Sequence, residues 1–113
     1  MKLKVKLWIE NNEEKLIFGD GKNLVLQHID STNSLEQTAK KLNMSEENVL
    51  KHLEILEENN EEEMVLKTQG LKKTSKASYI LTAEARETLQ TYQIYQYDVK
   101  KFAQKKFEEL FKT

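Results

Sequence analysis

Apolar and polar residues alternate at the start of the chain, where lysines separate Leu3, Val5, Leu7 and Ile9. A period of two residues is typical of a strand with one buried face. A polar turn, "ENNEEK", separates this run from a second short apolar run, "KLIF". The pattern therefore predicts an N-terminal β-hairpin over residues 2–18.

The next segment changes to the three- and four-residue spacing of an amphipathic helix. It begins near Gly21 and ends in "DSTN" at residues 30–33, a cluster of loop-forming residues. Leu24, Val25 and Ile29 share one face of this helix. We expect that face to pack into the core.

Two further helices follow, and each begins with a serine. "SLEQ" is a capping box, in which Ser34 accepts from the backbone N–H of Gln37 while the Gln37 side chain reaches back. Asn43 follows this short helix and tolerates the left-handed conformation that a tight turn needs. Ser45 caps the next helix. Its predicted buried stripe consists of Val49, Leu50, Leu53 and Leu56.

The last third of the chain contains a strand pair and then a long helix. "MVLKTQGLKKTSKASYILT" at residues 64–82 is typical of two strands joined by a basic loop. Thr82 caps a helix that nothing interrupts from Ala83 to about Phe111. At 1.5 Å per residue this helix would be roughly 40 Å long, more than a small core can cover.

These elements predict an α+β fold, mostly helical, with the element order of a winged helix-turn-helix. Residues 1–82 would form a DNA-binding domain with the hairpin at 2–18, the helix-turn-helix at 34–58 and the wing at 64–82. Residues 83–113 would form a long C-terminal helix that makes a dimer interface. A generic helical hairpin is the alternative interpretation of residues 34–58.

Composition narrows the class of protein. The 113 residues carry a net charge of −1 and include no cysteine, which excludes disulfides and thiolate metal sites. Lysines interrupt the apolar residues of the N-terminus, unlike a signal peptide, and no apolar run approaches the ~20 residues that span a bilayer. We therefore expect a cytoplasmic protein that does not act at a membrane.

Charge is distributed unevenly along the chain. Residues 45–63 contain eight glutamates and a single lysine, Lys51, whereas residues 64–79 contain four lysines and no acidic residue. So sharp a change of sign indicates two surfaces with different partners or roles. Ordinary solvated charge is the alternative interpretation.

No motif predicts catalysis, a metal site or a cofactor. "GDGK" lacks the further glycines, the span and the Ser or Thr of a phosphate-binding loop, and is better explained as a turn into the first helix. His28 and His52 are far apart, and neither has a second ligand at metal-binding spacing. No nucleophile, base and orienting acid can be assembled, so we expect a protein that is not an enzyme.

The segments "LWIE", "FGDGK", "AKKLNMS" and "LT", together with His52, resemble the N-terminal domain of the ModE family of molybdenum-responsive transcription regulators. That domain is itself similar to the LysR winged-helix domain. The resemblance covers nearly the whole chain. It implies a winged-helix fold, dimerisation through long helices and binding to an operator.

Several positions depart from the family pattern. Glu46 and Glu47 stand where the family usually has an aromatic and a basic residue, and Leu50 stands at its tryptophan position. The segment 64–82 has one glycine, Gly70, where the family's wing is glycine-rich. The sequence also ends where molybdate-binding domains would begin, so the resemblance implies no molybdate site.

Two function hypotheses remain. In the first, the protein regulates transcription by binding double-stranded DNA as a homodimer. In the second, the winged helix is a protein-interaction module whose acidic third helix meets a basic partner, and DNA is not bound. The candidate DNA-binding residues are Ser34, Gln37, Ser45, Glu46, Glu47, Asn48, Lys51, Lys67, Lys72, Lys73 and Lys76.

The C-terminal helix carries apolar residues at three- and four-residue steps over a wide stripe. One part of this stripe should pack on the domain. The remainder needs another cover, and a second copy of the chain is the simplest one. The candidate dimer-interface residues are Leu89, Tyr92, Tyr95, Val99, Phe102, Phe107 and Leu110.

Overall fold

The computed structural model describes residues 1–68 and 77–111 of the chain. The fold of these residues is α+β and mostly helical, as the sequence pattern predicted. Its elements, in chain order, are β1 (Trp8–Glu10), β2 (Leu16–Gly19), α1 (Asp20–Thr32), α2 (Leu35–Leu42), α3 (Glu46–Asn59), β3 (Val65–Thr68), β4 (Ser78–Leu81) and α4 (Ala83–Phe111).

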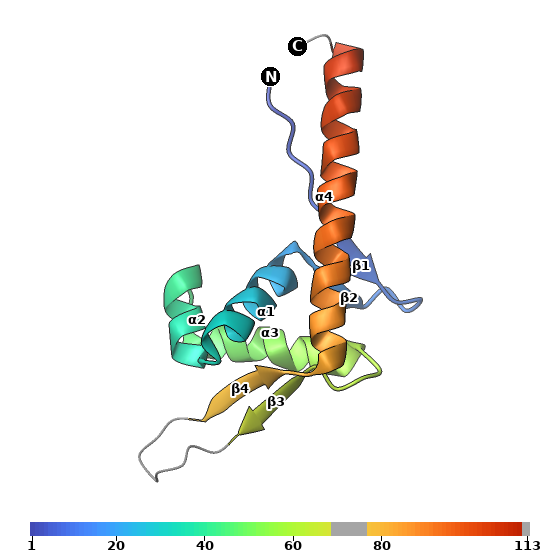
Figure 1. Ribbon diagram of the computed structural model, residues 1–113. Coiled ribbons are helices and arrows are strands. Elements are labelled where there is room, and N and C mark those ends of the chain that lie inside the picture. Colours follow the sequence, from blue (N-terminus) through green and yellow to red (C-terminus); the bar gives the residue numbers. More distant parts are fainter. Residues whose placement is uncertain (69–76, 112–113) are drawn as a thin grey trace.

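The molecule is elongated, with extents of 61 × 31 × 21 Å, because α4 continues far beyond the other elements (Figure 1). α1, α2 and α3 gather beside the first part of α4. The β3–β4 hairpin projects from the base of α4, past α2 and the start of α3 (Figure 1). Each of the two sheets in the described ranges is an antiparallel pair.

The N-terminal strand is shorter than the alternating pattern predicted. Only Trp8–Glu10 pairs with β2, and the register shifts between Ile9 and Glu10. Leu3, Val5 and Leu7 are nevertheless half-buried. At Leu7 the neighbour is α4, because the Tyr92 hydroxyl donates to the Leu7 carbonyl at 2.9 Å. A period of two residues reports one covered face, and a helix can supply that cover as well as a paired strand.

Helix α1 begins directly after β2 and ends at Asn33, whose φ of 54° lies in the left-handed region. The prediction for its buried face was wrong at one position. Leu24 is 47% exposed, whereas Leu26, which was not predicted, is fully buried with Val25 and Ile29. The face that meets the core is therefore rotated from the one that the sequence indicated.

The predicted helix caps are confirmed, with one correction. The Ser34 hydroxyl accepts from the Gln37 backbone N–H at 3.1 Å, and Thr82 caps α4 through the Ala85 N–H at 3.1 Å. The Gln37 side chain is exposed and does not complete a capping box. The Ser34 N–H donates to the Thr32 hydroxyl at 3.2 Å instead, because the preceding loop brings that hydroxyl closer.

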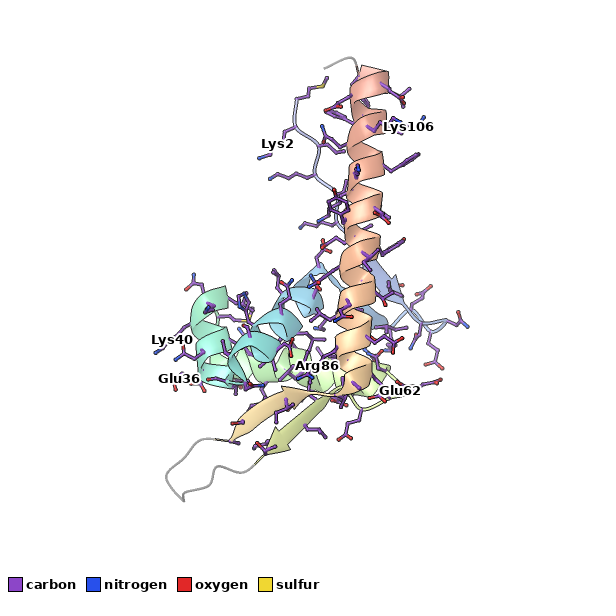
Figure 2. The ribbon with its side chains drawn as sticks, in the orientation of Figure 1. Lys2, Glu36, Lys40, Glu62, Arg86 and Lys106 are labelled. Atoms are coloured by element: carbon purple, nitrogen blue, oxygen red, sulfur yellow. The ribbon has the colours of Figure 1, made fainter. Side chains whose placement is uncertain are left out.

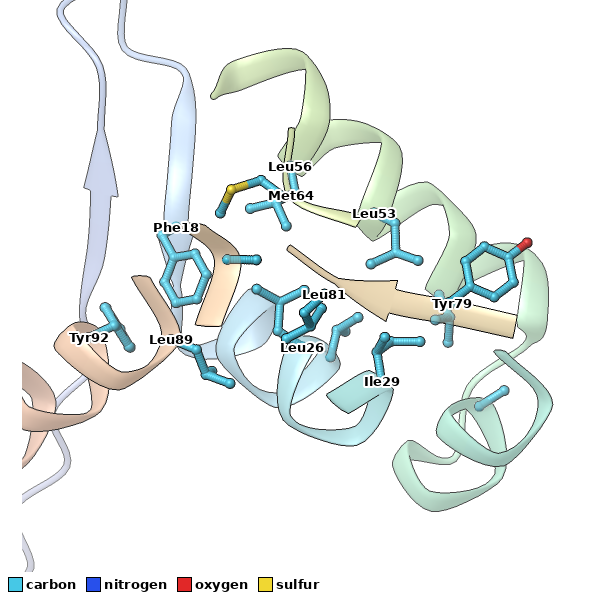
Figure 3. Packing of buried hydrophobic residues seen from close by; sticks show 14 residues of the cluster. Phe18, Leu26, Ile29, Leu53, Leu56, Met64, Tyr79, Leu81, Leu89 and Tyr92 are labelled. Atoms are coloured by element: carbon cyan, nitrogen blue, oxygen red, sulfur yellow. The ribbon is translucent and has the colours of Figure 1, made fainter. Parts of the chain in front are cut away.

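Buried side chains from every helix except the end of α4 form one core (Figure 3). Phe18 and Tyr92 pack edge to face with ring centroids 4.9 Å apart. The core residues are Phe18, Val25, Leu26, Ile29, Ala39, Val49, Leu53, Leu56, Met64, Tyr79, Leu81, Ala85, Leu89 and Tyr92. α4 therefore contributes its first three turns to the domain and leaves the rest without cover from this core.

Polar side chains fasten the C-terminal end of α3 to both hairpins. The Glu57 carboxylate accepts from the Met64 and Val65 backbone N–H groups at 3.0 and 2.7 Å, where β3 begins. The Asn59 and Asn60 side chains donate to carbonyls of β2 at 2.8 and 3.1 Å. Buried backbone groups need such partners, and here the side chains of a helix end provide them.

Candidate nucleic-acid interface

A tight turn joins α2 to α3 and brings the first turn of α3 to the surface. Asn43 ends α2 with φ 54° and ψ 50°, the left-handed conformation that was predicted for it. The Met44 N–H donates back to the Ala39 carbonyl at 3.0 Å. Ala39 is only 5% exposed, in keeping with the small side chain that a close helix crossing needs.

The first turn of α3 combines a structural cap with exposed charge. Ser45 accepts from the Asn48 backbone N–H at 3.0 Å, which leaves its hydroxyl proton available to another acceptor. Glu46, Glu47, Asn48 and Ser45 itself are exposed, as is Lys51 one turn further on. Glutamates in a first helical turn are also favoured by the helix dipole.

The β3–β4 hairpin lies next to this turn. One open cavity of about 230 Å³ is lined by Ser34 at the start of α2, Glu46 at the start of α3 and Lys67 on β3. Three predicted DNA-binding residues from separate elements therefore share one concave surface. Gln37 is exposed on α2 but does not line this cavity. Lys72, Lys73 and Lys76 lie outside the described residues.

A second open cavity, of about 620 Å³, lies over the turn between α2 and α3, with Ser45 and Glu46 in its lining. Lys40 also lines it, and its ammonium group lies 3.4 Å from the Glu36 carboxylate. Both side chains stand at the outer end of α2 (Figure 2). This part of the surface is polar and carries both signs of charge.

The acidic cluster that follows α3 lies elsewhere. Glu62 is near the base of α4, on the side of the molecule away from Lys40 (Figure 2). Glu57 is committed to the backbone of β3, as described above. The glutamates at the two ends of α3 therefore belong to different surfaces.

The predicted dimer residues on α4 fall into two groups. Leu89 and Tyr92 are buried in the chain's own core and cannot meet a partner. Val99 and Phe107 are half-buried. Tyr95, Phe102 and Leu110 are 50%, 61% and 74% exposed. Large exposed apolar side chains that the prediction did not include are Ile94, Tyr97 and Phe111.

Asp20 ties the middle of α4 to the start of α1. It accepts hydrogen bonds from Tyr92 and Gln96, and Lys100 lies 3.7 Å away. Burial acts to raise the pKa of Asp20, but these bonds and the Lys100 charge lower it below its ordinary value. Burial and the Asp20 carboxylate raise the pKa of Tyr92. The contact holds α4 in a fixed direction relative to the domain.

Sequence reasoning missed a contact between Lys22 and His52. The Lys22 ammonium lies 2.6 Å from His52 Nδ1, although the two residues are 30 positions apart. Burial lowers the pKa of Lys22, and burial together with the Lys22 charge lowers the pKa of His52. "GDGK" was expected to be only a turn, and no local spacing signals its lysine's partner on α3.

Comparison with protein-family models and with curated protein sequences found no match to this chain. Within residues 1–68 and 77–111, no helix is both long enough and apolar enough to cross a membrane. The same residues do not bring three His, Asp or Glu side chains together as a metal site would require. Function therefore has to be argued from the surfaces described above.

Proposed function

We propose that the protein is a DNA-binding transcriptional regulator of the winged helix-turn-helix class, in which α2 and α3 form the helix-turn-helix and the β3–β4 hairpin forms the wing. The observation that carries this proposal is the concave surface shared by Ser34, Glu46 and Lys67. It joins the exposed start of a helix to a projecting hairpin, as a protein that reads one groove and grips the flanking backbone requires.

Each part of this surface suits a different DNA group. Lys67 on the hairpin, with Lys72, Lys73 and Lys76 further along the same segment of sequence, would neutralise phosphates. Asn48 and Lys51 are exposed on the helix that would enter the major groove. Glu46 and Glu47 could accept from the N4 amino group of cytosine, a recognised base contact for glutamate.

The acidic residues beyond α3 do not exclude this arrangement. Glu57 is eleven positions after Glu46, which is about 16 Å along a helix axis. Exposed charges separated by more than about 8 Å are largely screened at physiological ionic strength. Repulsion of DNA would therefore come mainly from Glu46 and Glu47, and these two positions are the sharpest test of the proposal.

The same proposal includes a homodimer made by α4. The exposed side chains of Tyr95, Phe102 and Leu110 form part of an apolar surface of the size that usually marks an interface. An antiparallel partner helix would bring its C-terminal end over the start of α4. There, a cavity of about 530 Å³ is lined by apolar groups such as Tyr95 and edged by Glu84 and Glu87.

Charge along α4 favours this antiparallel pairing. Glu84 and Glu87 are exposed near its start, whereas Lys101 and Lys105 are exposed in its second half. Opposite charges would therefore meet when two copies of the helix run in opposite directions. Replacing Phe102 and Leu110 with glutamate should place charge in the seam and give a monomer in sedimentation experiments. Gln104→Glu, about 200° around the helix from Phe102, is the matched control and should sediment like the parent.

The DNA proposal is tested by titrating the protein against labelled random-sequence duplex DNA over a range of salt concentrations. Binding should weaken with salt, and Lys67→Ala should reduce the slope of log K against log salt by about 0.9, the value for one phosphate contact. Lys15→Ala, an exposed change in the other hairpin loop, is the control and should leave the slope unchanged.

Absence of binding at low salt, with fold and oligomeric state intact, would rule out the DNA-binding function. The alternative, a module whose acidic third helix docks a basic protein, would then remain. That alternative predicts that Glu46→Gln with Glu47→Gln weakens the protein complex and that neither form binds DNA.

A further inference from the structure

Lys22 is a buried cation without a neighbouring acidic group. Its side chain belongs to a residue that is 5% exposed, and its recorded hydrogen-bond partner is the His52 ring at 2.6 Å. An imidazole can accept this bond but brings no negative charge. Among the described residues, the recorded ion pairs do not include Lys22. A buried charge is costly unless it is paired, so this ammonium group has an unmet need for an anion.

The position of Lys22 in its helix adds to that need. It is the third residue of α1, where the helix dipole disfavours a cation and favours an anion. The N-cap residue is Gly19, and no side chain caps the helix. The Asp20 carboxylate in the same turn is engaged by Tyr92, Gln96 and Lys100 on α4. The start of α1 therefore presents uncapped backbone N–H groups beside a buried ammonium.

An open cavity of about 460 Å³ lies against these groups. Its lining includes Lys22 and His52, the backbone of Gly19 and Gly21, and Trp8. A side chain added at Gly21 would meet nothing within 4 Å, so the space above this helix start is open. Glu10 at the rim accepts the Trp8 indole N–H at 3.0 Å, and Glu14 is exposed. The positive groups thus lie in the buried part of the cavity and the free carboxylates at its edge.

We propose that this cavity is a binding site for a small oxyanion of the phosphate type, held by the Lys22 ammonium and the free N–H groups at the start of α1. Helix N-termini bind such anions through both their N–H groups and the dipole. His52 lies on α3 and contacts Lys22, so an anion there would also brace α3 against α1. The site is separate from the proposed DNA surface and does not depend on it.

Trp8 makes the proposal testable, because it is the single tryptophan of the chain and lines the cavity. The whole protein is titrated with inorganic phosphate at constant ionic strength, with chloride as the compensating anion. Trp8 fluorescence and the amide NMR signals of Gly21 and Lys22 are followed. We expect saturable changes in these signals and a rise in Tm with phosphate concentration, because a ligand that binds only the folded state stabilises it.

Lys22→Met keeps the length of the side chain and removes its charge. This variant should fold, because it no longer buries a charge, and it should bind phosphate at least about tenfold more weakly, the loss that about 1.4 kcal/mol of binding free energy represents. Lys105→Met, an exposed change on α4, should bind like the parent. The site does not exist if phosphate leaves the Gly21 and Lys22 amides and the Tm unchanged. Equal binding by Lys22→Met and the parent would overturn it too. The titration contains no DNA, so its outcome is independent of the proposed function.

Discussion

The two ends of α3 are built from similar residues but do different work. At the first end, Ser45 caps the helix and Glu46 and Glu47 are exposed. At the other end, Glu57, Asn59 and Asn60 bond to the backbone of both hairpins. The difference arises from the surroundings, because only the second end faces backbone groups that need partners. Acidic composition alone therefore does not define one surface, and the two ends should respond differently to the same change.

The largest effect should come from Glu57→Ala. This change removes the acceptor of two backbone N–H groups at the start of β3, and leaving such groups without a partner costs about 1–3 kcal/mol. Urea unfolding should show that loss in the free energy of unfolding. Glu58→Ala, the exposed neighbour, should change it by less than about 0.5 kcal/mol. Equal effects of the two changes would mean that the Glu57 contacts contribute nothing to stability.

At the first end, Ser45→Ala should lower the free energy of unfolding by about 1 kcal/mol, the usual cost of a lost N-cap. Ser45→Asp should restore most of it, since aspartate also accepts from the Asn48 N–H and favours the helix dipole. Thermal unfolding of the three proteins measures both effects. If aspartate fails to rescue, the hydroxyl has a role at this end other than capping.

Between the two ends, His52 should make stability depend on pH. Its pKa is lowered from the ordinary value of 6.5, so the unfolded chain binds its proton more readily than the folded one. Stability from this residue is complete above pH 6.5 and declines as the pH falls through that value towards the lowered pKa. His52→Gln should lose less stability over this interval. Parallel curves for the two proteins would contradict the assigned shift.

Features set by neighbours in the sequence could be predicted. Ser45 and Thr82 were identified as caps because a cap depends on residues two or three positions away. Asn43 was predicted to be left-handed for the same reason. On the candidate DNA surface, the exposed start of α3 follows from the helix-turn-helix pattern, but the cavity that Lys67 shares with Ser34 and Glu46 depends on how the hairpin packs.

Features set by distant parts of the chain could not be predicted. Glu57 looked like a solvated charge, and its role appears only when β3 lies beside it. Lys22 and His52 are joined across α1 and α3, which no spacing in the sequence records. Leu89 and Tyr92 belong to the same apolar stripe as Phe102, and only the extent of the core separates buried from exposed members.

The central claim is that the start of α3 faces DNA and its acidic end does not. It is tested most directly by comparing two double variants with equal charge changes, Glu46→Gln with Glu47→Gln, and Glu61→Gln with Glu62→Gln. Both are titrated with the parent against random-sequence duplex DNA at low salt. The account predicts that the parent binds, that the first pair tightens binding by relieving repulsion, and that the second pair has a much smaller effect. Equal effects of the two pairs, or no binding by any of the three folded proteins, would contradict it.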